Sequence, residues 1–305
     1  MSGLRNFYPL LLLSVIGRSE SFVPRPALVP SLVAVNGVPF FADEVGDSAV
    51  ANADEAPKDA APPADVTLTT TSGDTASILE AAEFMVNSFW LQSPQNLVVD
   101  GDDPSSISDG ARSSLIEEQQ DDLTSKYGEI MGVRTLQSGL VTAADGEGLL
   151  GLVGVEAALL DRNSMQVLVA ERSEAMLKNA VASLGPKQRR EYKNSPASDV
   201  VDQLLPSNLD LVVVLSNLSV SPRARRRGVA MSLCREAERM AKEDWTFDKI
   251  CLKVEEGNDA ARSLYEKKLG YEKVASNPAI GLRVDIKNGK FEEVPAETLL
   301  LTKKL

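Results

Sequence analysis

The chain has 305 residues, of which 43% are hydrophobic and 25% are charged, as is ordinary for a globular protein of one or two domains. Its formal net charge is −12, from 44 acidic and 32 basic residues, which disfavours nucleic acid as a bulk partner. The sequence contains no histidine, which excludes imidazole acid–base catalysis, histidine metal ligands and serine–histidine or cysteine–histidine pairs.

The N-terminal segment is predicted to be a targeting sequence. Residues 9–16 form an apolar run after Arg5 that is too short to span a bilayer and is typical of a signal-peptide core. The junction at Phe22 and the acid-free residues 22–42 resemble the bipartite plastid-targeting presequences of algae with red-derived plastids. We therefore predict a signal peptide over 1–21 and localisation in the plastid stroma, with a plain secretory signal as the alternative.

The two cysteines, Cys234 and Cys251, lie in apolar periodic segments. They are typical of buried thiols in a reducing compartment, although the sequence leaves a disulfide open. This cysteine usage favours the plastid over an oxidising destination.

A linker is expected to follow the targeting sequence. Residues 43–65 are rich in alanine, aspartate and proline, a composition typical of disorder. We assign 22–65 to a transit-peptide-like segment and this acidic linker. One folded domain is predicted over 66–305, beginning with a short alternating strand at 66–70.

The first half of the domain contains helical and hairpin patterns. One apolar helical face recurs between Ile78 and Phe89, and a second helix carries Leu115, Gln119, Leu123 and Tyr127. Residues 140–144 and 149–160 flank an Asp-Gly-Glu-Gly turn and predict a hairpin. A helix-like stretch at 174–184 precedes a basic cluster that we expect to be a solvated surface loop, formed by Lys187, Arg189, Arg190 and Lys193.

The second half alternates strands with helices. Strands are predicted at 211–215, 250–254, 271–274 and 299–301, and helices at 231–242 and 258–269. Strands joined through helices give an α/β protein with a mixed sheet. No run after the presequence is long and apolar enough to suggest a membrane span.

The turn between the first of these strands and its helix is rich in arginine and contains Gly228. A helix N-terminus presents free N–H groups and a favourable dipole to an anion, and a glycine lets a bulky anion approach the backbone. The pattern predicts a phosphate or pyrophosphate site. A basic helix start without a ligand, or a nuclear-localisation or nucleic-acid patch, is the alternative interpretation.

Two motifs resemble those of one enzyme superfamily. Arg225, Gly228 and Ala230 satisfy Q/R-x-x-G-x-G/A, the acetyl-CoA-binding motif of the GNAT acyltransferases. Residues 258–271 resemble that family's N-x-x-A-x-x-L-Y-x-x-x-G-F/Y helix. The resemblance implies the GNAT N-acyltransferase fold, a central and mostly antiparallel sheet flanked by helices. It is most similar to plastid GNATs, which acetylate protein N-termini and lysines.

The resemblance also implies residue roles, with acetyl-CoA as co-substrate and no metal. Backbone N–H groups and arginines of the turn would hold the pyrophosphate, strand residues would pair with the pantetheine arm, and Asn258 would hydrogen-bond that arm. Tyr265 would protonate the departing thiolate. Tyr265 as a core residue and Asn258 as a helix N-cap remain alternatives. The implied cofactor-binding residues are Leu218, Val220, Arg225, Arg226, Arg227, Gly228, Val229, Ala230 and Asn258.

The general base is not identified by the resemblance. The positions where many relatives place a carboxylate or imidazole are occupied by Val214 and Lys253. Glu156 and Glu255 are possible substitutes, and both are compatible with an ordinary surface carboxylate. The expected activity is acetyl transfer from acetyl-CoA to N-terminal or lysine amines of proteins. A small-amine N-acetyltransferase, a non-catalytic acyl-CoA-binding protein and a nucleic-acid-binding module remain as alternatives.

Overall fold

The computed structural model describes residues 65–71, 73–92, 94–99, 101–128 and 136–305. The predicted signal peptide and nearly all of the predicted transit and linker segment lie outside these residues. All of the described residues belong to one compact unit of the chain.

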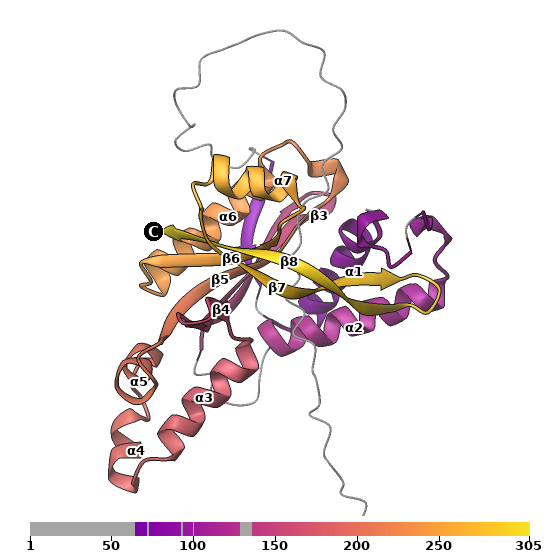
Figure 1. Cartoon of the computed structure of the whole chain (residues 1–305). Helices are drawn as coiled ribbons and strands as arrows, with labels where there is room; N and C mark the ends of the chain where they lie inside the picture. The colour runs from indigo at the N-terminus through magenta and orange to yellow at the C-terminus, as the bar shows by residue number, and fades with distance from the viewer. Residues whose placement is uncertain (1–64, 72, 93, 100, 129–135) are drawn as a thin grey trace, which may run out of the picture. The chain divides into compact units, whose positions relative to one another are not determined.

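The described strands form one mixed sheet of eight strands in the order β1-β2-β3-β5-β6-β8-β7, with β4 paired to β3 (Figure 1). All neighbours are antiparallel except β5 and β6, which are parallel. The prediction of a mixed, mostly antiparallel sheet flanked by helices is confirmed. The strands are β1 Thr67–Thr70, β2 Ser138–Asp145, β3 Gly148–Asp161, β4 Gln166–Val167, β5 Leu209–Val220, β6 Lys249–Glu255, β7 Glu272–Asp285 and β8 Lys290–Lys304.

The helices connect and flank these strands. The α-helices are α1 Thr75–Ser88, α2 Asp109–Tyr127, α3 Ala170–Ala182, α4 Pro186–Tyr192, α5 Ala197–Leu204, α6 Val229–Arg239 and α7 Asp259–Arg262. π-Helical turns follow two of them, Met240–Asp244 after α6 and Ser263–Lys268 after α7. Short 3₁₀ turns are Trp90–Gln92, Pro94–Asn96, Pro104–Ser106 and Pro222–Ala224.

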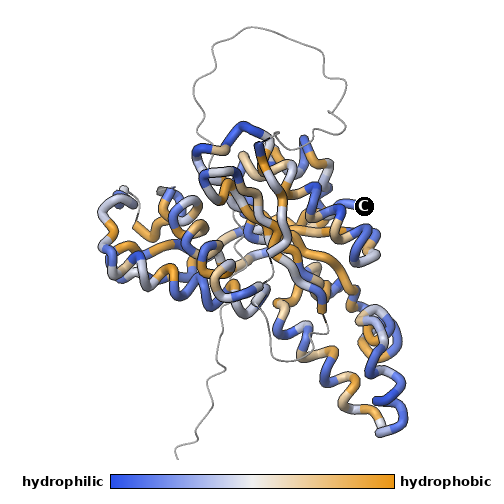
Figure 2. Tube along the Cα trace, turned by 180° about the vertical axis from the view of Figure 1, so that it is seen from behind, coloured by the Kyte–Doolittle hydropathy of each residue, from blue (hydrophilic) through white to orange (hydrophobic). Residues whose placement is uncertain are grey.

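The two faces of the sheet bury different partners. Val153 and Val155 of β3 belong to the apolar cluster that includes Leu233 of α6. Leu152, which projects from the other face, packs with residues of α1 and α2. Apolar residues gather along the central strands, whereas many polar residues lie on the helices and turns around them (Figure 2). We call these the α6 face and the α2 face.

A polar residue on the predicted apolar face of α2 is explained by its partner. Gln119 is fully buried, and its Oε1 accepts a hydrogen bond of 2.8 Å from the indole Nε1 of Trp90. The second helical face therefore contributes to a genuine core with α1.

Strands β5 and β6 separate toward their C-terminal ends. Their pairing covers only residues 213–215 against 250–252, although β5 continues to Val220 and β6 to Glu255. A register shift between β3 and β5 coincides with Asn217, whose φ of 55° is left-handed. An extra residue in one strand increases local bending and twist, so this bulge explains why β5 diverges.

Several sequence predictions are corrected. The strands predicted at 271–274 and 299–301 are the ends of a long hairpin, β7–β8, because alternating exposed residues obscured its apolar pattern. The basic cluster predicted as a loop lies mainly on α4, where Pro186 suits the first helical turn.

Both cysteines are free and buried, and burial raises the pKa of the Cys251 thiol to about 12. None of the described helices meets the length and apolarity needed to cross a membrane.

Candidate functional site

The arginine-rich turn ends in a left-handed backbone that opens onto α6. Arg226 has φ 65°, and Gly228, the N-cap of α6, has φ 85°. A Cβ added to Gly228 would meet no described heavy atom within 4 Å. The glycine is therefore favoured by backbone conformation, and it leaves space directly before the helix.

The N-terminus of α6 has hydrogen-bond donors to offer. The first helical bond runs from the Ser232 N–H to the Gly228 carbonyl at 3.0 Å. The N–H groups of the three preceding residues thus have no acceptor in the helix, and no described side chain caps them. The helix dipole adds positive potential at the same point.

A cavity of about 650 Å³ lies against this helix start. Seven residues predicted to bind the cofactor line it: Val220, Arg225, Arg226, Gly228, Val229, Ala230 and Asn258. Sequence reasoning missed other lining residues, including Gln95, Met231, Ser263, Leu264 and Lys268. Leu264 stands in the second motif and could have been chosen from it, whereas Gln95 comes from a distant 3₁₀ turn and carries no local signal.

Arg225 is the cation best placed for an anion in this cavity. It is half-buried, and its Nε and Nη2 atoms have no hydrogen-bond partner among the described residues. Burial lowers the pKa of its guanidinium. Buried guanidinium nitrogens without a hydrogen-bond partner are costly even in a half-buried side chain, so a bound anion would stabilise this arrangement.

The neighbouring arginines have different environments. Arg223 forms a two-point ion pair with Asp145 at 2.8 and 3.0 Å, which ties the turn to the β2–β3 hairpin. That hydrogen-bonded pair lowers the pKa of Asp145 to about 2. Arg227, predicted to bind the cofactor, is instead 2.6 Å from Asp65 and does not line the cavity.

Asn258 is a helix N-cap that also lies on the wall of the cavity. Its Oδ1 accepts a hydrogen bond of 3.1 Å from the Ala261 N–H, which is an N-cap of α7. The residue also lines the cavity. A capping role is therefore observed, and it is compatible with contact to a ligand.

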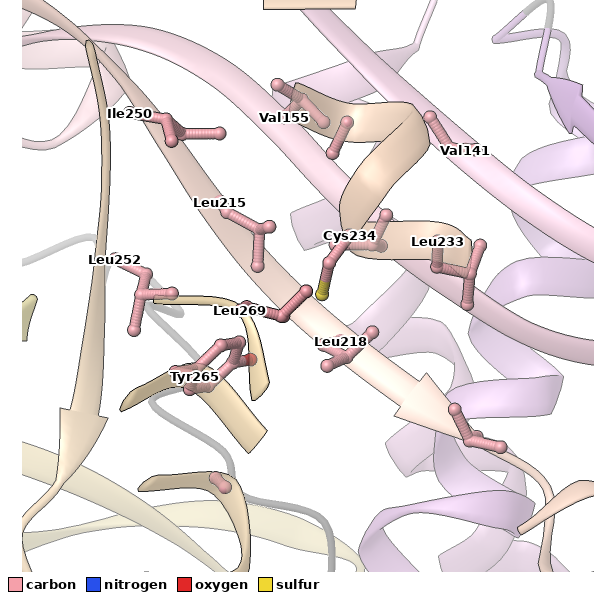
Figure 3. Close-up of a cluster of buried hydrophobic side chains, with 14 of the residues drawn as sticks. Val141, Val155, Leu215, Leu218, Leu233, Cys234, Ile250, Leu252, Tyr265 and Leu269 are labelled. Carbon is pink, nitrogen blue, oxygen red and sulfur yellow. The ribbon is translucent and has the colours of Figure 1, made fainter. Parts of the chain in front are cut away.

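Tyr265 and Leu218 belong to the apolar cluster of the α6 face and do not line the cavity, although Leu218 was predicted to bind the cofactor. In Figure 3, the Tyr265 ring lies between β6 and β5 with its hydroxyl directed toward the β5 end that carries Leu218. Its ring packs edge-on against Tyr271, with centroids 5.8 Å apart. Burial, with a smaller contribution from the Cys234 thiol, raises the pKa of Tyr265 well above its usual range, so the phenol stays protonated.

The π-helical turn that carries Tyr265 has a cause in the sequence. Four residues separate Tyr265 from Gly270, whereas the family motif has three. The Leu269 N–H bonds to the Leu264 carbonyl, five residues back, at 3.0 Å. The extra residue is thus accommodated as a π-bulge, a feature frequent at functional sites.

The candidate base residues differ sharply. Glu255 is held by Arg283 in two contacts of 2.9 Å. Glu156 is buried on β3, and its Oε2 has no hydrogen-bond partner among the described residues. Burial is the main cause that raises the pKa of Glu156. Val214 lies in an apolar cluster, and the Lys253 Nζ donates to the Val167 carbonyl at 3.3 Å.

Comparison with known proteins finds a family that is similar to part of the chain. Residues 206–271 match the sequence model of the acetyltransferase (GNAT) family, and this segment contains both motifs and the diverging strands. A search of curated proteins gave no significant match. The match supports the resemblance of this segment to GNAT acetyltransferases.

Solved structures of acetyltransferases match the chain at low similarity. Arabidopsis thaliana NAA60 with acetyl-CoA is 15% identical, with 79% of this chain and 98% of that chain covered and a TM-score of 0.42. A GNAT-family acetyltransferase from Streptococcus pneumoniae is 14% identical, with 79% and 99% covered and a TM-score of 0.40. Mosquito arylalkylamine N-acetyltransferase like 5b is 15% identical, with 79% and 100% covered and a TM-score of 0.38.

Proposed function

We propose that this acyltransferase transfers acetyl from acetyl-CoA to primary amines of proteins, either N-terminal α-amines or lysine ε-amines. The observation that carries the donor half is the cavity at the start of α6, where Arg225 has buried, unpartnered nitrogens. A pyrophosphate group matches both these nitrogens and the free N–H groups of the helix start. These hydrogen-bond donors therefore fit the pyrophosphate of acetyl-CoA.

Different groups of the chain bind the donor and supply a proton for the reaction. The helix start and Arg225 bind the charged part of the donor, which supplies an activated thioester. Beyond residue 215, β5 is no longer paired with β6, so its backbone groups on that side are available to an extended ligand arm, as an added strand would use them. Tyr265 holds a proton at the divergence of the strands, where the family resemblance places the departing thiolate.

The α-amine and the lysine ε-amine of a protein differ in how readily they lose a proton. An α-amine has a reference pKa of about 7.7–8.0 and is substantially neutral at slightly alkaline pH, whereas lysine at about 10.4 needs more help from a base. N-terminal amines are therefore the less demanding acceptors. A small-molecule amine such as a polyamine or arylalkylamine is the second candidate acceptor.

Acetylation profiling would test the proposed acceptor. The full chain and its Gly228→Asp variant would be expressed in a bacterial host, and acetylated N-termini and lysines would be mapped by mass spectrometry. We expect new acetylated sites with the wild type and none with the variant. Unchanged host proteins, together with consumption of acetyl-CoA by purified protein given spermidine or tryptamine, would replace proteins with small amines as the acceptor.

We also propose a plastid location, supported by the presequence pattern at 1–42. A C-terminal fluorescent fusion of the full chain, expressed in an alga with a red-derived plastid, should accumulate in the stroma. Fluorescence in the endomembrane system or medium would favour the secretory alternative.

A further inference from the structure

A row of buried polar groups lies on the α2 face, opposite α6. In the β3–β5 pairing, Gly154 is opposite Ser216, Glu156 is opposite Val214, and Leu152 is opposite Ser219. Residues directly opposite in an antiparallel pair project from the same face, so Ser216, Ser219 and Glu156 share the face of Leu152. All three are buried, and the Ser219 Oγ and Glu156 Oε2 have no hydrogen-bond partner among the described residues.

This row ends where β5 and β6 diverge. Val214 is the partner of both Glu156 on β3 and Cys251 on β6, and it is one residue from the end of the β5–β6 pairing. Lys253 follows Cys251 by two residues and therefore shares its face. Ligand atoms that pass between the separating strands from the α6 face would emerge beside Glu156 and Lys253.

A glycine on β3 leaves room for a polar side chain of α2 on this face. The Tyr127 hydroxyl of α2 lies 2.9 Å from the Ser216 Oγ. A Cβ on Gly154 would collide with that hydroxyl, so the glycine permits α2 to approach the strand. Asn217, at the bulge next to Ser216, is also buried, and both of its amide atoms lack a partner among the described residues.

The charges around Glu156 come from each element packed near it. Lys126 and Asp122 of α2 form a buried pair at 3.0 Å, and α3 contributes Glu171. Lys253 of β6 lies near it as well, and burial lowers the pKa of that amine. Lys126 and Lys253 favour the Glu156 carboxylate, whereas Asp122 and Glu171 disfavour it. The Oε2 atom of Glu156 has no hydrogen-bond partner among the described residues, so it can accept a hydrogen bond from a ligand.

Resting on the function proposed above, we propose that the acceptor amine binds on the α2 face and that Glu156 is its general base. The Ser219 hydroxyl and the Asn217 amide, which are buried and have no partner among the described residues, then hydrogen-bond polar groups next to that amine. A base on β3 replaces the positions occupied by Val214 and Lys253, neither of which can act as a carboxylate base.

The proton balance of this step is simple. The ammonium acceptor gives one proton to the Glu156 carboxylate, directly or through one water, and becomes a neutral amine. Its nitrogen forms the new C–N bond to the acetyl carbonyl carbon, and the C–S bond breaks. The second nitrogen proton goes to the departing thiolate, by way of the Tyr265 hydroxyl in the family assignment. Glu156 then releases its proton to solvent.

Glu156→Gln is the direct test, because glutamine keeps the shape and removes the base. For wild type and variant, kcat/KM would be measured from pH 6 to 9.5 with a peptide bearing a free N-terminus and separately with spermidine. We expect a loss of roughly 100-fold at pH 7, in the range of general-base contributions, and unchanged calorimetric affinity for acetyl-CoA. The loss should shrink as the pH rises, because solvent then deprotonates the amine. Glu156→Asp should recover part of the activity.

Glu255→Gln is the matched control, since it neutralises a strand carboxylate that is already held by Arg283. Its pH profile should follow the wild type. A Glu156→Gln loss that is constant across pH, or no loss at all, would overturn the assignment of the base. If the wild type acetylates spermidine but not the peptide, the proposed protein acceptor fails while the pH comparison still tests Glu156.

Discussion

The donor cavity and the polar row of the α2 face differ in how the chain builds them. The cavity is made mostly from one stretch around the start of α6 and another at α7, and it relies largely on backbone N–H groups. The polar row gathers residues from α2, β3, β5 and β6, which lie far apart in the sequence. The cavity proposed for the donor is thus built by local motifs, whereas the polar row proposed to serve the acceptor depends on tertiary packing.

The largest expected effect is a loss of acetyl-CoA binding when the cavity at the start of α6 is altered. Gly228→Asp places a carboxylate and a strained left-handed residue at the anion site, where like charge and the positive φ both oppose binding. We expect calorimetric acetyl-CoA affinity to fall by at least ~100-fold, about 2.8 kcal/mol. Gly270→Asp is the control, since Gly270 also has positive φ and open space but lies outside the cavity. Equal losses in both variants would mean that backbone strain alone explains the effect.

Tyr265→Phe tests the phenol hydroxyl that is proposed to protonate the departing thiolate. Loss of a general acid typically costs ~100-fold or more in rate, so kcat should fall far more than acetyl-CoA affinity. Tyr271→Phe removes a hydroxyl from the neighbouring ring of the same core and should leave kcat nearly unchanged. A wild-type kcat for Tyr265→Phe would return this residue to a packing role.

The arginines give a smaller and more selective effect. Arg225→Ala removes charge-assisted hydrogen bonds, typically ~1.5–3 kcal/mol, and should weaken acetyl-CoA binding by roughly 10-fold or more. Arg227→Ala removes only an exposed ion pair with Asp65, so titration calorimetry should show less than about a 2-fold change. The reverse ranking would mean that Arg227 leaves Asp65 to bind the donor.

The smallest effect concerns the stability of the acceptor side. A raised folded-state pKa for Glu156 means that the folded chain binds more protons than the unfolded chain between the unfolded pKa and the folded one. Wild-type stability therefore decreases as the pH rises through that window. Glu156→Gln should unfold at a higher temperature than the wild type at pH 8, by roughly 2–4 °C for each 1 kcal/mol of burial cost, and the gain should vanish near pH 4. A lower unfolding temperature at pH 8 would indicate that Glu156 stabilises the fold.

The residues predicted to bind the donor are brought together because their sequence signals are local. The strand, the glycine turn and the helix period stand within a few residues of each other, and the structure brings seven of the predicted residues to one cavity. Arg227 was predicted to bind the donor, yet it pairs with Asp65 and does not line the cavity, because its orientation depends on tertiary packing. The alignment of Glu156 with the end of the β5–β6 pairing depends on strand register and a bulge at Asn217, which no short motif encodes.

Calorimetry and turnover on the same preparations test most directly whether donor and acceptor chemistry are separated. Wild type, Gly228→Asp and Glu156→Gln would each be titrated with acetyl-CoA and then assayed with one free-N-terminus peptide at pH 7. We predict that Gly228→Asp loses both binding and turnover, whereas Glu156→Gln binds acetyl-CoA like the wild type and turns over roughly 100-fold more slowly. Loss of acetyl-CoA binding in Glu156→Gln, or wild-type turnover in either variant, would contradict the account.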